Sequence, residues 1–318
     1  MTSTTKRAPA GPDLETIRRA HRRIAPYIVR TPVLTSPALD ELAGARLFFK
    51  CESLQRSGSF KLRGASNAVF SLTDVEAARG VVTHSSGNHG AALALAAKMR
   101  GIRAWIVMPR NASKAKIRNV ESHGGEITFC EPTVEAREAA AAELLRRTGT
   151  VLIHPYDDDR IIAGQGTAAL ELLEEVPDLN VICAPVGGGG LLSGTSIAAK
   201  SLQPEILVIG CEPKNADDAA RSLSAGHIEP MAATTTLADG LRGMLAPRTF
   251  AILRERISRI ALVTEDEILQ AMRLAAEQLH CAVEPSAAVA VSPALHRQLG
   301  AEGRRVGIIL SGGNLDAN

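Results

Sequence analysis

A lysine near residue 60 has neighbours that could make its amine reactive. Lys61 lies between Phe60 and Leu62, directly after the turn-forming stretch Ser57-Gly58-Ser59, and residues 62–70 are expected to form a helix. Desolvation by apolar neighbours and the positive end of a helix dipole both lower the pKa of an amine. A neutral amine is what a Schiff-base lysine requires. The same stretch also fits a surface lysine whose stem covers its apolar neighbours.

A polar loop follows an expected strand at residues 80–83. It reads Thr83-His84-Ser85-Ser86-Gly87-Asn88-His89-Gly90 and leads into an alanine-rich helix at 91–99. Backbone N–H groups at the start of a helix bind anions, and the hydroxyls, amide and imidazole suit a substrate carboxylate. The loop also fits an ordinary strand-to-helix turn in which serine and asparagine satisfy local donors.

A run of four glycines, Gly187-Gly188-Gly189-Gly190, joins an expected strand at 180–186 to a further helix. Glycine lets the backbone wrap closely around an anion, and the helix dipole favours phosphate. The run lacks the Gly-Lys-Ser/Thr of a P-loop and fits the Gly-x-Gly-x-x-Gly dinucleotide fingerprint poorly. The sequence therefore favours a phosphate site here over a purely structural turn.

Two more loops with possible chemistry follow expected strands. Ser311-Gly312-Gly313-Asn314 ends the last strand, and its hydroxyl and glycines would allow a flat ligand to approach closely. The stretch 211–218 carries the carboxylates of Glu212, Asp217 and Asp218, which together with exposed carbonyls could hold a hard cation. A simple turn and a solvated acidic loop are the alternatives for these two stretches.

The elements that must position these loops alternate between strand and helix. An amphipathic helix is expected at 13–25, with Asp13 as its N-cap, and a strand at 47–50. From residue 79 to 153 the pattern is βαβαβαβ, which predicts an α/β lobe with a parallel sheet. A second series contains helices at 161–176 and 265–277, strands at 180–186, 206–210 and 305–310, and a loop-rich stretch at 213–248.

The alternation predicts two lobes, each with its own core. Residues 53–157, with a core at 79–157, are expected to form a small domain, and residues 1–52 with 158–318 a large one. A chain of 318 residues is long enough for both. In such parallel sheets, ligands bind at the carboxyl ends of the strands, where several of the loops above lie.

Composition argues against several classes of protein. The 36 basic and 34 acidic residues leave a net charge of +2, which gives no reason to expect a nucleic-acid partner. No apolar run reaches the roughly 20 residues of a membrane span. The first ten residues lack the apolar core of a signal peptide, so a disordered tail is expected there. The five cysteines are far apart, which predicts reduced thiols in a cytoplasmic protein.

Taken together, these stretches resemble the fold type II pyridoxal-phosphate enzymes, also called tryptophan synthase β-like, and among them the serine/threonine dehydratase and serine racemase branch. The resemblance implies a two-lobed α/β fold with parallel sheets flanked by helices, whose large domain binds pyridoxal 5'-phosphate. The matching stretches, in the family's order, are 59–65, 85–90, 163–167, 185–190, 237–240, 284–286 and 310–314.

The resemblance also implies a role for each matching residue. Lys61 would carry the cofactor as a Schiff base, and Ser86 would handle the proton on the opposite face. The residues expected to hold the cofactor are Phe60, Asn88 at the ring hydroxyl, Gly187, Gly188, Gly189, Gly190 and Leu191 at the phosphate, and Ser311 at the pyridine nitrogen. Those expected to position the substrate are Ser85, Ser86, His89 and Arg137. Those expected to hold magnesium or manganese are Glu212, Ala216 through its carbonyl, and Asp218.

The implied activity is that of an L-threonine/L-serine dehydratase, which removes the α-proton, eliminates the β-hydroxyl and yields a 2-oxo acid and ammonia. A serine opposite the ring nitrogen does not stabilise a full positive charge there, which favours elimination over transamination. Tyr156 stands where animal serine racemases carry an asparagine near the substrate, and this difference favours the dehydratase. The substrate would be a small amino acid, and the family resemblance implies a homodimer or a tetramer.

Other activities fit the same residues. The first alternative is a serine or aspartate racemase with side dehydratase activity, since Lys61 and Ser86 would lie on opposite faces of the substrate. The second is a 3-hydroxyaspartate dehydratase. The cation loop and the stretch 85–89 argue against a β-replacement synthase of the cysteine synthase type, and the retained lysine argues against a relative without catalytic activity.

Overall fold

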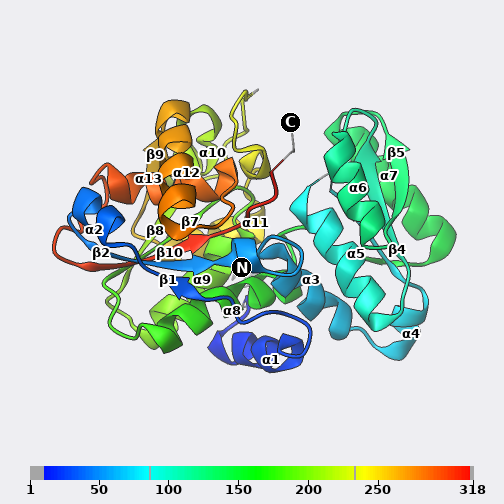
Figure 1. The fold of residues 1–318 in the computed structure, drawn as a ribbon. Coiled ribbons are helices and arrows are strands. Elements are labelled where there is room, and N and C mark those ends of the chain that lie inside the picture. Colours follow the sequence, from blue (N-terminus) through cyan, green and yellow to red (C-terminus); the bar gives the residue numbers. More distant parts are fainter. Residues whose placement is uncertain (1–10, 86, 233, 316–318) are drawn as a thin grey trace, which may run out of the picture.

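The computed structural model describes residues 11–85, 87–232 and 234–315. The tail expected at residues 1–10 and the candidate Ser86 lie outside these residues. Figure 1 shows two α/β lobes side by side, each built around its own sheet. The predicted α/β class, with parallel sheets flanked by helices, is confirmed.

The larger sheet has six strands in the order β1-β2-β10-β7-β8-β9. Only the pairing of β1 with β2 is antiparallel, and the other pairings are parallel. All five residues of β7 are buried, as expected for a strand covered on both faces. The strands are β1 (Val33–Leu34), β2 (Arg46–Cys51), β7 (Val181–Pro185), β8 (Leu207–Pro213), β9 (Arg259–Val263) and β10 (Arg305–Leu310).

Helices cover both faces of this sheet. Successive residues of β7 alternate between the two cores, with Val181 and Cys183 on one face and Ile182 and Ala184 on the other. One layer contains α2 (Pro37–Ala43), α12 (Glu265–Leu279) and α13 (Pro285–Leu295). The other contains α1 (Leu14–Ile24), α8 (Asp159–Glu175), α9 (Gly190–Leu202), α10 (Asp218–Ala225) and α11 (Pro247–Arg256).

The smaller sheet has four parallel strands in the order β5-β4-β3-β6. The predicted βαβαβαβ succession is confirmed. The strands are β3 (Val81–His84), β4 (Ala104–Pro109), β5 (Glu126–Cys130) and β6 (Val151–Leu152). The helices of this lobe are α4 (Asp74–Ala78), α5 (Asn88–Arg100) and α6 (Lys114–Ser122) on one side, and α7 (Val134–Thr148) on the other.

One helix, α3 (Lys61–Phe70), connects the lobes, because it packs against both α8 and α5 (Figure 1). Gly64 allows the close approach to α8, since a Cβ built on Gly164 of that helix would lie 2.5 Å from the Gly64 Cα. The apolar side chains of α3 share a core with the smaller sheet. This packing supports the small domain predicted for residues 53–157, whose boundaries remain a prediction.

A buried ion network holds α3 against the larger sheet. The Arg63 guanidinium donates from Nε to Glu52 at 2.7 Å and from Nη2 to Glu171 at 2.8 Å. The Lys50 ammonium lies 2.7 Å from the same Glu171 carboxylate. All four side chains are at most 1% exposed, and their charges balance. The network therefore ties the start of α3 to β2 and α8.

The structure departs from the expected elements mainly at short ones. The stretch 213–248, expected to be loop-rich, contains α10 and the 3₁₀ helices η2 (Lys214–Ala216) and η3 (Asp239–Leu241). A further 3₁₀ helix, η1 (Glu52–Leu54), follows β2. Helices of one or two turns show too few apolar positions for a period to be read from the sequence. None of the helices in the described part of the chain is long and apolar enough to cross a membrane.

Candidate active site

The lysine turn and the C-terminal loop are joined by backbone contacts. Phe60 donates its N–H to the Ser311 carbonyl at 2.9 Å, and Ser59 pairs with Gly312 in an isolated β-bridge. β10 runs parallel to β2 and β7, so the loop that starts at Ser311 lies at their carboxyl edge. These contacts bring Lys61, the first residue of α3, to the end of the sheet where ligands bind.

The Lys61 amine points into the protein. Its Nζ donates to the Pro155 carbonyl at 3.1 Å and lies 5.1 Å from the centre of the Phe60 ring. Burial lowers the pKa of this amine to about 8, and the nearby Glu284 carboxylate offsets part of that effect. A substantial neutral fraction near neutral pH suits a Schiff-base lysine, and the surface alternative is not what the structure shows.

The four-glycine loop forms a cradle in which larger residues do not fit. Gly187 and Gly189 have φ angles of +51° and +85°, which favour glycine. A Cβ on Gly188 would lie 2.4 Å from the Tyr156 ring. At the start of α9 the first backbone N–H groups, which include that of Leu191, lack intrahelical acceptors. A cradle of glycines with free N–H donors fits the phosphate of pyridoxal phosphate.

Tyr156 forms one wall of this cradle. Besides its contact with Gly188, its backbone and Cβ would be about 3 Å from a Cβ on Gly190. Its ring packs edge-on against His154 with centroids 4.6 Å apart. Burial raises the pKa of the Tyr156 phenol. Position 156 therefore shapes the phosphate cradle directly.

Asn88, the first residue of α5, belongs to a polar cluster that the sequence did not predict. Its Nδ2 donates to both carboxylate oxygens of Glu284, at 2.9 and 3.1 Å. Its Oδ1 accepts from Nδ2 of Asn314 at 2.9 Å. Burial raises the pKa of Glu284 to about 7. Glu284 lay in a matching stretch without an assigned role, and only its place in an apolar N-terminal helix turn could have drawn attention to it.

The expected substrate residues are in different settings. Ser85 is half-buried, and its Oγ accepts from the Gly87 N–H at 3.4 Å. His89 is 2% exposed, its Nε2 lies 3.4 Å from the Ile153 carbonyl, and burial holds its pKa well below the usual range. Arg137 on α7 is half-buried and forms no ion pair with any described residue. Of these three, His89 is the one that faces the core.

Two acidic residues expected at the cation site are buried together. Glu212 accepts from the N–H groups of Ala219 and Ala220, and burial raises its pKa to about 8. Asp218 has no hydrogen-bond partner for either carboxylate oxygen among the described residues, and burial raises its pKa to about 6. Ala216, the third expected ligand, is also buried. A pair of buried acids with so few donors requires protons or a cation for charge balance.

No group of three or more His, Cys, Asp or Glu side chains among the described residues is placed to hold a metal. The expected site contains only two such side chains and one carbonyl, so it is a different kind of set. Oxygen ligands of this type suit magnesium, manganese or calcium.

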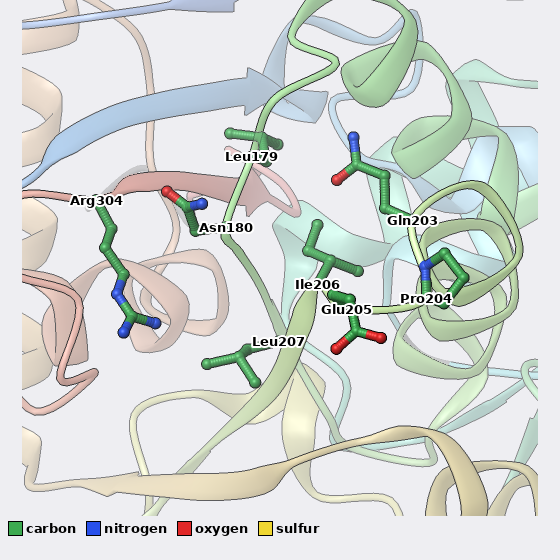
Figure 2. A pocket seen from close by; sticks show the side chains of 8 residues that line it. All are labelled: Leu179, Asn180, Gln203, Pro204, Glu205, Ile206, Leu207 and Arg304. Atoms are coloured by element: carbon green, nitrogen blue, oxygen red, sulfur yellow. The ribbon is translucent and has the colours of Figure 1, made fainter.

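A separate hollow of about 350 Å³ lies at the opposite edge of the larger sheet (Figure 2). Its lining residues directly precede or begin β7, β8 and β10, whereas the glycine loop follows β7. They are Leu179, Asn180, Gln203, Pro204, Glu205, Ile206, Leu207 and Arg304. The hollow is therefore not part of the candidate active site.

Comparison with known proteins gives one family. The family model described as pyridoxal-phosphate dependent enzyme matches residues 24–312. The chain is 50% identical over 309 residues to a serine racemase of Arabidopsis thaliana, covering 96% of this chain and 93% of the relative. It is 48% identical over 305 residues to a beta-hydroxyaspartate dehydratase of Paracoccus denitrificans, covering 96% and 97%.

Solved structures give the same result. The structure of maize serine racemase superposes with a TM-score of 0.95 at 47% identity, covering 96% of this chain and 95% of that one. A bacterial-type threonine deaminase structure, from the source abbreviated T.th., superposes with a TM-score of 0.91 at 44% identity, covering 96% and 100%.

Proposed function

This chain belongs to the pyridoxal-phosphate dependent enzymes of fold type II, and we propose that it racemises serine and also eliminates water from serine and related β-hydroxy amino acids. The observation that carries the proposal is the identity of 48–50% with serine racemases from plants and Dictyostelium discoideum, over 95–96% of this chain. These relatives favour the racemase over the dehydratase that the sequence put first.

The cofactor would be held by residues that are already oriented for it. The N–H groups of the glycine loop and of Leu191 would bind the phosphate, Asn88 would donate to the ring hydroxyl, and Ser311 would face the pyridine nitrogen. When bound, pyridoxal phosphate supplies an electron sink for the electron pair that remains after the α-proton is removed.

The protein contributes the proton transfers. With a pKa near 8, the Lys61 amine is a base of suitable strength to accept a proton from the α-carbon of a bound amino acid. Racemisation also requires a proton donor on the opposite face, and Ser86 is the candidate for that role. Elimination begins with the same proton removal and continues with loss of the β-hydroxyl, so one site supports both reactions.

A second candidate is a dehydratase for 3-hydroxyaspartate. It is supported by the Paracoccus relative, which has that activity in its name, and by the unpaired charge of Arg137, which could bind a second carboxylate. The L-threonine reaction is a third candidate, supported by the threonine deaminase structure.

Some parts of the proposal are supported only by the family resemblance or by local chemistry. A magnesium or manganese ion bound by Glu212, the Ala216 carbonyl and Asp218 would balance the buried acid pair. A cytoplasmic homodimer or tetramer follows from the resemblance alone.

The test is to incubate the purified, cofactor-loaded enzyme with L-serine and to measure D-serine by chiral chromatography and pyruvate by a coupled assay. Parallel samples contain L-threonine and the stereoisomers of 3-hydroxyaspartate, with and without magnesium. The proposal predicts D-serine and pyruvate together, and neither with the Lys61→Ala variant. A 2-oxo acid without D-serine would replace the racemase by a dehydratase, and no product from any substrate would refute both.

A further inference from the structure

Glu284 is a buried carboxylate beside the cofactor site to which no role has been given. It precedes α13 as its N-cap residue and is 8% exposed. Its own N–H donates to the Gly312 carbonyl at 3.1 Å, and a Cβ on Gly312 would lie 2.5 Å from Glu284 Oε1. The carboxylate is thus enclosed by the C-terminal loop on one side and by α5 on the other.

The contacts of Glu284 fix which way the Asn88 amide points. An ionised carboxylate only accepts hydrogen bonds, so the Asn88 side that faces it at 2.9 and 3.1 Å must be the NH₂ group. The Asn88 carbonyl is then left to accept from Asn314, whose Nδ2 lies 2.9 Å away. Asn314 is itself held, because its N–H donates to Glu284 Oε2 at 3.2 Å and its Nδ2 donates to the Ser57 carbonyl at 2.9 Å.

With its carbonyl engaged, Asn88 can offer only N–H donors to a ligand. This is the polarity needed to bind an ionised ring hydroxyl, which is an acceptor. If the amide were free to flip, half of its orientations would present a carbonyl to that oxygen and repel it. The carboxylate therefore selects the useful orientation.

Glu284 also interacts with charges on three other elements. These are the Lys61 amine on α3, Asp239 on η3 and Lys116 on α6. Asp239 opposes ionisation of Glu284, and Lys116 favours it. An ionised Glu284 raises the pKa of Lys61, while His89 and His154 are the other titratable groups that interact with that amine.

We propose that Glu284 is a positioning residue of the cofactor site: its carboxylate fixes Asn88 as an N–H donor to the cofactor, and its negative charge favours the protonated form of Lys61. The inference depends on the cofactor site of the proposed function. It does not depend on which reaction that site catalyses.

The test compares Glu284→Gln with the unchanged protein in the cofactor-free form. Binding of pyridoxal phosphate is measured by equilibrium dialysis, and the rate at which the visible absorption band appears is measured as a function of pH. We expect the dissociation constant of the cofactor to rise by about tenfold, the size of one lost or misdirected hydrogen bond. We expect the midpoint of the rate profile to move down by roughly half a pH unit, because a neutral glutamine no longer favours the ammonium.

Two further comparisons separate positioning from a general structural effect. In the Asn88→Ala background, Glu284→Gln should change the dissociation constant less than about twofold, because the orientation effect acts through Asn88. Glu277→Gln on the exposed face of α12 is the matched control and should change neither quantity. If Glu284→Gln does not fold, Asn314→Ala, which releases the Asn88 carbonyl, must weaken cofactor binding several-fold for the inference to stand.

The outcomes are distinct. If Glu284→Gln binds the cofactor like the unchanged protein and shows the same midpoint, the inference is wrong while the cofactor site stands. If the unchanged protein itself binds no pyridoxal phosphate, the proposed function fails, and the inference fails with it.

Discussion

At the scale of single residues, the buried pair Glu212 and Asp218 makes stability depend on pH. Burial raises the pKa of Glu212 from 4.5 to about 8 and that of Asp218 from 3.8 to about 6. Between about pH 4 and pH 8 the folded chain therefore holds more protons than the unfolded chain, so the free energy of unfolding falls as the pH rises. A bound divalent cation would remove this loss, because it balances the charge that protons otherwise cancel.

We therefore expect the melting temperature measured in a chelator to fall as the pH rises from about 5 to 8, and magnesium to reduce that fall. Asp218→Asn should flatten the pH dependence in chelator and abolish the magnesium effect. Differential scanning calorimetry of both proteins in both buffers measures this directly. The cation site is excluded if magnesium stabilises the Asp218→Asn variant as much as the unchanged protein.

Single residues differ in how far the sequence could predict them. Lys61 and the glycines at 187–190 stand out because their chemistry is written in a few consecutive residues. Glu284 and Asn314 act only through contacts with Asn88, which is separated from them by about two hundred residues, and no local pattern predicts such a meeting. Their partners could be identified only from the folded chain.

At the scale of elements, the position of α3 depends on the ion network around Arg63. Glu171 is 1% exposed and accepts from both Arg63 and Lys50, and these cations hold its pKa well below the usual range. Glu171→Gln removes a buried charge and leaves two buried cations with only Glu52, which should cost about 3–5 kcal/mol of unfolding free energy. Because α3 begins with Lys61, the same variant should bind the cofactor more weakly. Urea unfolding measures the first effect, and a loss below about 1 kcal/mol would contradict this account of the network.

The contact between α8 and α9 depends on glycine. A Cβ on Gly194 would lie 2.4 Å from the Ile162 carbonyl and 2.5 Å from the Gly166 N atom. Gly194→Ala should therefore push the helices apart at a cost of about 1–3 kcal/mol. Ser201→Ala, at an exposed position of the same helix, is the control and should be close to neutral. Equal midpoints of urea unfolding for the two variants would show that the helices can adjust without cost.

Elements were predictable where their patterns are long. The succession of strands and helices from β3 to β6 was expected, because each strand is an apolar run and each helix spans more than two turns. The five-residue α4 and the eight-residue α10 were not expected, since a stretch of that length does not establish a period. The ion network was missed for another reason: Lys50, Glu52, Arg63 and Glu171 look like surface residues in a linear sequence.

At the scale of the whole molecule, the fold is common to two activities. Solved structures named serine racemase and threonine deaminase superpose on this chain with TM-scores of 0.95 and 0.91. Both activities begin with removal of the α-proton, so the overall fold does not decide between them. The resemblance to fold type II enzymes is confirmed by the family model, whereas the preference for a dehydratase rested on Tyr156. Because Tyr156 packs against Gly188 and Gly190, its identity reflects the shape of the phosphate cradle more than the choice of reaction.

The account as a whole depends on Lys61 being the residue that carries the cofactor. The most direct test is to load the protein with pyridoxal phosphate, reduce it with borohydride, digest it and locate the added mass by tandem mass spectrometry. The account predicts a single stoichiometric label on Lys61 and no label or visible absorption band in Lys61→Ala. A label on another lysine, such as Lys50 or Lys116, or an unlabelled protein that retains full activity, would contradict it.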